Sequence, residues 1–292
     1  MAHESLITLS SGPLRLALAP ERGGCVTRFD HVAVSGSKTE IFRGVEGAPD
    51  FILDAASFAL VPFCNRVRGG TFDFRNRKVT LAGNLPGEPS PLHGQGWVST
   101  WEVVRCSKDA AELLFHHAAD EWPWDYEARQ FFTLRPTGLE VVLSCSNLSD
   151  QPMPCGLGHH PYFRCDGDTR LDAKVACAWT IDEQVLPVEN VPAEGRYDLR
   201  RRAVCGQDLD NGFGGWDGRA RIDGALRIEL SSPEAKFFHL YSPPVGGFFA
   251  AEPASHANAA LNEPQHEWAE LGLRVLDPGE TMTLTMRVDV AQ

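Results

Sequence analysis

Acid–base side chains lie in a few short, turn-rich stretches of the sequence. In GLGHHPYF, residues 156–163, His159 and His160 stand side by side ahead of a proline and two aromatic residues. Histidine titrates near neutral pH, so it can give or take a proton during a reaction. Comparable stretches are FCNRVRGG (63–70), PLHGQGW (91–97), EWPWDY (121–126), DLDNGFGGWDG (208–218) and FFAAEPASHANAALN (248–262).

These stretches combine the residue types that a carbohydrate site requires. Arg, Asn and Asp form hydrogen bonds with sugar hydroxyls, and the apolar faces of a sugar ring stack on Trp, Tyr or Phe. A carboxyl group with a raised pKa can act with a histidine in proton transfer. The sequence has neither a phosphate-binding glycine loop nor the GxSxG turn of a serine hydrolase.

The paired histidines leave three roles open: packed core residues, metal ligands, or a proton donor at a sugar site. Adjacent residues of a strand point to opposite faces, so such a pair does not easily bind one metal ion. His116 and His117 have the same geometry in a predicted strand, and we assign them no role.

The elements that would position these residues are strands, because the dominant hydrophobic period is two. GTFDFRNRKVTLA (70–82) alternates apolar and polar residues on both sides of RNRK, which is typical of a β-hairpin. Residues 131–150 repeat this pattern around Pro136, and residues 100–106, 224–232 and 282–290 also indicate strands. Only residues 51–61 and 254–261 look briefly helical. We therefore expect an all-β fold, one large antiparallel β-sandwich formed by residues 1–292 as a single domain.

Charge and composition exclude several classes of function. With 27 Lys and Arg against 39 Asp and Glu, the net charge is 27 − 39 = −12, which is unfavourable for binding nucleic acid. No apolar run approaches the ~20 residues of a membrane span. The N-terminal stretch MAHESLITLSSG does not resemble a signal peptide, and the eight cysteines include no CxxC pair. These features predict reduced thiols in a cytoplasmic protein.

Five motifs in order resemble those of the aldose 1-epimerase (galactose mutarotase) family, over roughly residues 10–290. They are Asn65-Arg66, Leu92-His93-Gly94, His160-Pro161-Tyr162-Phe163, Asp210-Asn211-Gly212-Phe213 and Glu252-Pro253. Each motif alone is weak, but their order on a β-rich chain of this length is specific. The resemblance implies interconversion of the α and β anomers of a free aldose, without cofactor or metal.

The resemblance also implies roles for individual residues. Glu252 would be the base that takes the anomeric hydroxyl proton, and His160 the acid that protonates the ring oxygen. His93 would stabilise charge at the ring oxygen. The substrate-binding residues would be Asn65, Arg66 and Asp210. Among the aromatic residues, Tyr162 and Trp124 are the candidate sugar contacts, although Trp122 and Trp124, which flank Pro123, could instead cover a sheet edge. Without the resemblance, Arg66 and Asp210 could equally form structural ion pairs.

Several features leave the substrate and some roles open. Gln95, Pro161 and the segment EPASHANAAL depart from the galactose-specific pattern, so the sugar, a free hexose or pentose, is not determined. The roles of His159, His256 and Trp122 are also undetermined. The sequence is compatible with a monomer or a homodimer.

Three alternative functions remain at this stage. A hexose-6-phosphate epimerase of the same fold would need a cationic pocket, for which Arg68, Arg75 and Arg77 are the candidates. A sugar-binding protein without catalysis would use the same polar residues. A metal-dependent β-fold enzyme is the most distant alternative.

Overall fold

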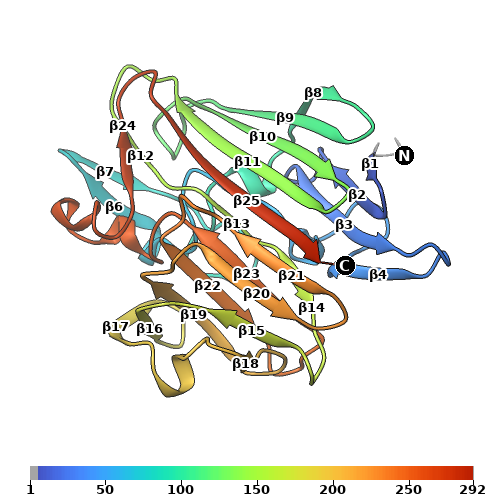
Figure 1. Cartoon of the computed structure of the whole chain (residues 1–292). Helices are drawn as coiled ribbons and strands as arrows, with labels where there is room; N and C mark the ends of the chain where they lie inside the picture. Colours follow the sequence, from blue (N-terminus) through green and yellow to red (C-terminus); the bar gives the residue numbers. More distant parts are fainter. Residues whose placement is uncertain (1–5, 292) are drawn as a thin grey trace.

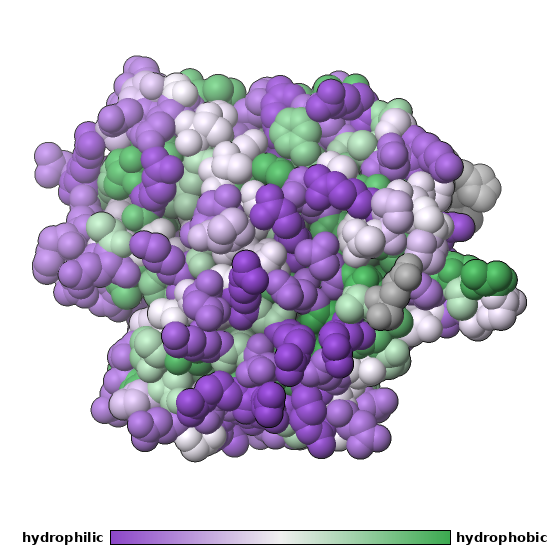
Figure 2. Space-filling model, viewed as in Figure 1, coloured by the Kyte–Doolittle hydropathy of each residue, from purple (hydrophilic) through white to green (hydrophobic). Residues whose placement is uncertain are grey.

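The computed structural model describes residues 6–291, and its strands form two large antiparallel sheets (Figure 1). Residues 1–5, which begin the stretch MAHESLITLSSG, and residue 292 lie outside the described residues. The prediction of an all-β, antiparallel fold is confirmed. No helix of the described residues is long and apolar enough to cross a membrane. The face of the molecule in Figure 2 is mainly hydrophilic, with small scattered apolar patches.

The first sheet is 12-stranded and carries the residues of interest. Its main path runs β1-β2-β3-β4-β14-β23-β22-β19-β16-β17, and the short β13 pairs with both β23 and β5. The strands are β1 (Ile7–Ser11), β2 (Leu14–Ala19), β3 (Cys25–Val32), β4 (Lys38–Phe42), β5 (Ala59–Leu60), β13 (Gly158–His159), β14 (Tyr162–Arg164), β16 (Cys177–Ile181), β17 (Pro187–Pro192), β19 (Leu209–Gly214), β22 (Phe237–Ser242) and β23 (Phe248–Ala254).

The second sheet is 9-stranded, in the order β18-β15-β20-β21-β25-β11-β10-β9-β8. Its strands are β8 (Glu102–Cys106), β9 (Ala110–His117), β10 (Tyr126–Arg135), β11 (Gly138–Asn147), β15 (Arg170–Ala173), β18 (Arg202–Ala203), β20 (Arg219–Asp223), β21 (Arg227–Ser231) and β25 (Thr281–Ala291). Two small sheets pair β12 (Met153–Cys155) with β24 (Arg274–Leu276), and β6 (Thr71–Phe74) with β7 (Arg77–Thr80).

The hairpins form at the residues where the alternation of apolar and polar side chains predicts them. β6 and β7 pair from Thr71–Thr80 to Phe74–Arg77, so the turn is only Arg75 and Asn76. β10 and β11 close around Pro136 and Thr137. The last strand, β25, lies between β11 and β21 and is drawn in red across the middle of the second sheet (Figure 1).

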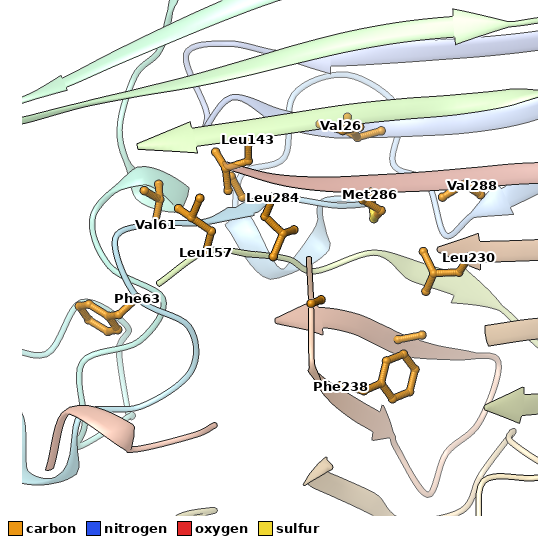
Figure 3. Close-up of a cluster of buried hydrophobic side chains, with 14 of the residues drawn as sticks. Val26, Val61, Phe63, Leu143, Leu157, Leu230, Phe238, Leu284, Met286 and Val288 are labelled. Atoms are coloured by element: carbon orange, nitrogen blue, oxygen red, sulfur yellow. The ribbon is translucent and has the colours of Figure 1, made fainter. Parts of the chain in front are cut away.

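The core lies between the sheets, where apolar side chains of alternate strand positions meet. Leu143 of β11 and Leu284 of β25 lie close to Leu157 and Val61 from the opposite layer (Figure 3), and all four are buried. Burying a leucine side chain stabilises the fold by roughly 1.5–3 kcal/mol. This packing fixes the first sheet, so its other face can present polar residues at defined positions.

The two segments that look briefly helical in the sequence contain only short 3-10 turns. Residues 51–61 contain only the 3-10 turn η1 (Ile52–Asp54) before β5, and residues 254–261 run from the end of β23 into η5 (Ala260–Asn262). Neither segment has the apolar stripe of period 3.6 that stabilises an amphipathic helix. The other short 3-10 turns are η2 (Arg68–Gly70), η3 (Gly96–Val98), η4 (Gly195–Tyr197) and η6 (Gln265–Glu267).

Candidate active site

Three neighbouring strands of the first sheet carry the centre of the site. β23, β22 and β19 lie side by side (Figure 1). Glu252 of β23 is directly opposite His239 of β22, and Asp210 of β19 is opposite Tyr241, two residues further along β22. Opposite residues of antiparallel strands share a face, as do residues i and i+2. The three polar side chains therefore project from the same face of the sheet.

His160 and Glu252 are in direct contact. Nε2 of His160 lies 3.1 Å from Oε1 of Glu252, and their exposed fractions are only 6% and 2%. Burial raises the pKa of the Glu252 carboxyl to about 8, against the opposing effect of His239. Burial also lowers the pKa of His160 to about 3, with a further contribution from His239. The pair therefore retains a proton at neutral pH that an exposed carboxylate would lose.

His93 reaches the same place from a tight loop. The His93 backbone has a positive φ of 57°, and a Cβ on the next residue, Gly94, would lie 2.0 Å from the carbonyl oxygen of Val61. The Asn65 backbone N–H donates to Nδ1 of His93 at 3.0 Å, so the neutral ring carries its proton on Nε2. Burial, with His160 and Arg66, lowers the pKa of His93 well below its usual range. The rings of His93 and His160 are 5.5 Å apart and nearly perpendicular.

Asn65 and Arg66 form the polar side of the site. Nη1 of Arg66 donates to Oδ1 of Asn65 at 3.1 Å, while Nε and Nη2 donate to Oε2 of Glu88 at 3.2 and 2.9 Å. The Arg66 backbone N–H donates to Oδ1 of Asn258 at 3.1 Å. Arg66 is therefore both part of a structural ion pair and a neighbour of the site. Sequence reasoning did not identify Glu88 or Asn258, because their contacts cross long gaps in the chain.

His239 is the most central residue that the sequence analysis missed. Its Nε2 lies 2.7 Å from Oδ1 of Asp210, and its Nδ1 lies 3.2 Å from Nδ2 of Asn65. Burial would raise the pKa of Asp210, but the hydrogen bond and charge of His239 and the charge of Arg66 lower it overall. In the apolar stretch FFHLYS the histidine has no motif around it. Its alternation with Tyr241 was the one available signal.

Aromatic rings enclose His160. Phe58 stacks on it at 4.6 Å, and the Tyr162 ring lies at 4.6 Å on a tilted plane. The Arg43 guanidinium covers the Tyr162 ring at 4.2 Å. Tyr162 is thus next to His160, while Phe163 packs against Phe42 and Phe249.

Trp124 is not part of this group, which corrects the sequence-based assignment. Its buried ring packs against Phe74 and Trp122, and Trp122 in turn packs against Phe63. Because only 2% of Trp124 is exposed, its ring has almost no accessible surface for a sugar. The tryptophan that lines the cavity beside Glu252 and His239 is Trp179.

The remaining histidines of the motifs, His159 and His256, lie next to backbone groups. His256 accepts the Cys64 N–H on Nε2 at 2.8 Å and contacts the Ala257 carbonyl through Nδ1 at 2.7 Å, so it fixes the loop beside the site. The His159 ring points away from the site and toward the Leu284 backbone of the second sheet. The paired histidines therefore face opposite sides, as expected.

The three arginines considered for a phosphate pocket do not converge. Arg68 donates to the Pro187 carbonyl at 3.0 Å, whereas the guanidinium groups of Arg75 and Arg77 lie over Phe74 and Trp124. Each arginine side chain contacts residues in its own neighbourhood, so the three do not form a common cationic pocket.

Comparison with known proteins gives one consistent family. The family profile described as aldose 1-epimerase matches residues 5–289. The uncharacterized protein YphB of Escherichia coli K12 is 33% identical, over 98% of this chain and 99% of its own. A crystal structure of a proposed aldose 1-epimerase from Escherichia coli K12 has 31% identity and a TM-score of 0.89, covering 98% of this chain and 99% of that one.

A more distant structure supports the fold alone. A galactose mutarotase-like protein from Clostridium acetobutylicum has 19% identity and a TM-score of 0.84, with 98% of this chain and 95% of that one covered. The ordered motifs, the sandwich and the match over nearly the whole sequence lead to one conclusion: this chain belongs to the aldose 1-epimerase family.

Proposed function

We propose that the protein is an aldose mutarotase that interconverts the α and β anomers of a free hexose or pentose. The observation that carries this proposal is the 3.1 Å contact between His160 Nε2 and Glu252 Oε1. Mutarotation moves a proton between two oxygens bonded to the same carbon, the anomeric hydroxyl and the ring oxygen. An acid and a base side by side in a buried place match that spacing.

The pKa values place the proton of the pair on Glu252 in the free protein, and in the reactive form this proton has moved across the contact to His160. The Glu252 carboxylate then takes the anomeric hydroxyl proton while the protonated His160 gives a proton to the ring oxygen. The ring opens to the aldehyde, the C1–C2 bond rotates, and the ring recloses as Glu252 returns its proton and His160 recovers one. The pair thus uses one mobile proton, and the two groups exchange roles between opening and closing. Each such group contributes about 10²- to 10⁴-fold to the rate.

The residues around the His160–Glu252 pair position the sugar and stabilise the charge that develops on it. His93 presents a neutral ring with its free proton on Nε2, next to His160, where it can donate to the ring oxygen. Arg66 and Asn65 hold hydroxyls on one side, and Asp210 accepts from hydroxyls away from C1. Tyr162 and Trp179 offer aromatic surface to the ring.

The test is anomeric exchange measured by NMR over a panel of free hexoses, pentoses and their 6-phosphates. We expect at least one free aldose to exchange faster with the enzyme than without it. No acceleration for any free sugar would overturn the proposal. Faster exchange of the 6-phosphates than of the free sugars would favour the phosphate-specific alternative.

One substitution distinguishes a mutarotase from a sugar-binding protein without catalysis. Glu252→Gln preserves size and hydrogen bonding but cannot take a proton. A mutarotase loses turnover while retaining sugar affinity, whereas a binding module has no turnover to lose.

A further inference from the structure

A hydrogen-bond chain with a defined direction runs through the floor of the site. It begins at Arg66, whose Nη1 donates to Oδ1 of Asn65 at 3.1 Å. The other atom of that amide, Nδ2, lies 3.2 Å from Nδ1 of His239, and Nε2 of His239 lies 2.7 Å from Oδ1 of Asp210. Glu88 holds the Arg66 end through two contacts to its Oε2.

The chemistry of the two ends sets the direction of every bond. A guanidinium only donates, so Oδ1 of Asn65 must face it and Nδ2 must face His239. An ionised carboxylate only accepts, so Nε2 of His239 must carry a proton toward Asp210. Nδ1 of His239 must then accept from Asn65. All three bonds are satisfied together in one protonation state, the neutral ring with its proton on Nε2.

We propose that His239 is a positioning residue for the sugar site, and that the chain from Arg66 to Asp210 is complete only while the His239 ring is neutral. A proton added at Nδ1 would set two donors, the ring and the Asn65 amide, against each other. Asn65 would have to turn over, which would present its amide hydrogens to the Arg66 guanidinium. Asn65, Arg66 and Asp210 are the residues that we propose hold sugar hydroxyls, so the inference rests on the proposed function.

The charged groups around His239 favour the protonated form of its ring. Asp210 faces it from β19 and Glu252 from β23, while Arg66 faces it from the loop after β5. The rings of His160 and His93 are the other titratable groups that it influences. Burial lowers the pKa of His239, but Glu252 and the hydrogen bond and charge of Asp210 raise it by more, so the net shift is upward. Sugar affinity should therefore weaken as the pH falls through the raised pKa of His239.

The first measurement needs no sugar and so stands apart from the proposed function. In ¹⁵N-labelled protein, the ring signals of His239 are identified by their loss in His239→Gln. At pH 8 we expect a protonated Nε2 and an unprotonated Nδ1, and protonation of Nδ1 on acidification. Two protonated nitrogens at pH 8, or a ring that stays in one state from pH 5 to 9, would overturn the inference.

The second measurement compares KM and kcat across pH for an accepted aldose. Gln at position 239 can accept from Asn65 and donate to Asp210 but does not titrate, so His239→Gln should flatten the pH dependence of KM. The change in kcat should be smaller than the change in KM and reflects the effect of His239 on the pKa values of His160 and Glu252. His239→Leu should raise KM about tenfold, the result of losing about 1.4 kcal/mol of binding. The exposed His266 provides the control, and His266→Gln should retain the wild-type profile. A titrating KM in His239→Gln would also overturn the inference.

Discussion

His160 and Glu252 come from positions almost a hundred residues apart, yet their Nε2 and Oε1 atoms lie 3.1 Å from each other in a place shielded from water. The two groups therefore titrate as a pair, which takes up a second proton below a pKa of about 3 and loses its one mobile proton above a pKa of about 8. The proposed reaction requires that proton.

Replacing Glu252 should remove turnover and spare binding. In Glu252→Gln the base is lost, so we expect kcat to fall by about 10²- to 10⁴-fold. Sugar affinity, measured by calorimetry, should remain within a few-fold of the wild type. Glu263→Gln, at an exposed position, is the matched control and should be fully active. Equal kcat in both variants would show that Glu252 is not the base.

The pH profile should fall on the alkaline side. Between about pH 3 and pH 8 the pair holds one mobile proton, and above pH 8 it loses that proton. We expect kcat/KM, corrected for uncatalysed mutarotation, to drop about tenfold per pH unit well above 8. A kcat/KM that still rises at pH 9 would mean that the ionised carboxylate alone is the active form.

The free energy of unfolding should depend on the protonation of the Glu252 carboxyl group. Its pKa is about 8 in the folded protein, raised from 4.5, so the folded state holds a proton between these values that the unfolded chain has lost. This contribution is fully present below pH 4.5 and is lost as the pH rises through 8. Glu252→Gln should therefore become increasingly more stable than the wild type from pH 5 to 8. Thermal unfolding at several pH values measures this, and a constant difference would contradict it.

Sugar binding should require the planar guanidinium group of Arg66, which donates several hydrogen bonds at once. Lysine cannot contact Glu88 twice and also reach Asn65, so Arg66→Lys should raise KM by about tenfold with a smaller change in kcat. Glu88→Gln should change KM in the same direction, because it removes the charge that holds Arg66. Arg77→Lys, which alters only a surface guanidinium near Trp124, should leave KM unchanged.

Trp124 should matter for stability alone. Trp124→Ala removes a buried ring from the Phe74–Trp122 cluster and should cost about 3–5 kcal/mol of unfolding free energy. Trp124→Phe tests function with less damage to the core, and its KM should equal that of the wild type. A large increase in KM for this variant would restore Trp124 to the sugar site.

The strands and the motif residues of this protein could be predicted because both depend on local pattern. Alternation marks the hairpin at 70–82 and the final strand, and the motifs indicated His93, His160 and Glu252, which the structure brings together. His239 and Glu88 could not be found this way, since His239 reaches the site through strand order and Glu88 through a loop contact with Arg66. Trp124 was misassigned because its local sequence, two tryptophans around a proline, does not reveal which rings will cover it.

The position of β25 has a consequence for how the protein folds. This strand lies in the interior of the second sheet, between β11 and β21, and its Leu284 packs in the core beside Leu157 and Val61 (Figure 3). The parts of the second sheet on either side of β25 therefore cannot join until this strand is in place. Such a topology, dominated by contacts between distant segments, folds slowly. Until then β11 and β21 each have an unpaired strand edge, so the chain in which β25 has not yet docked is the form most prone to aggregation.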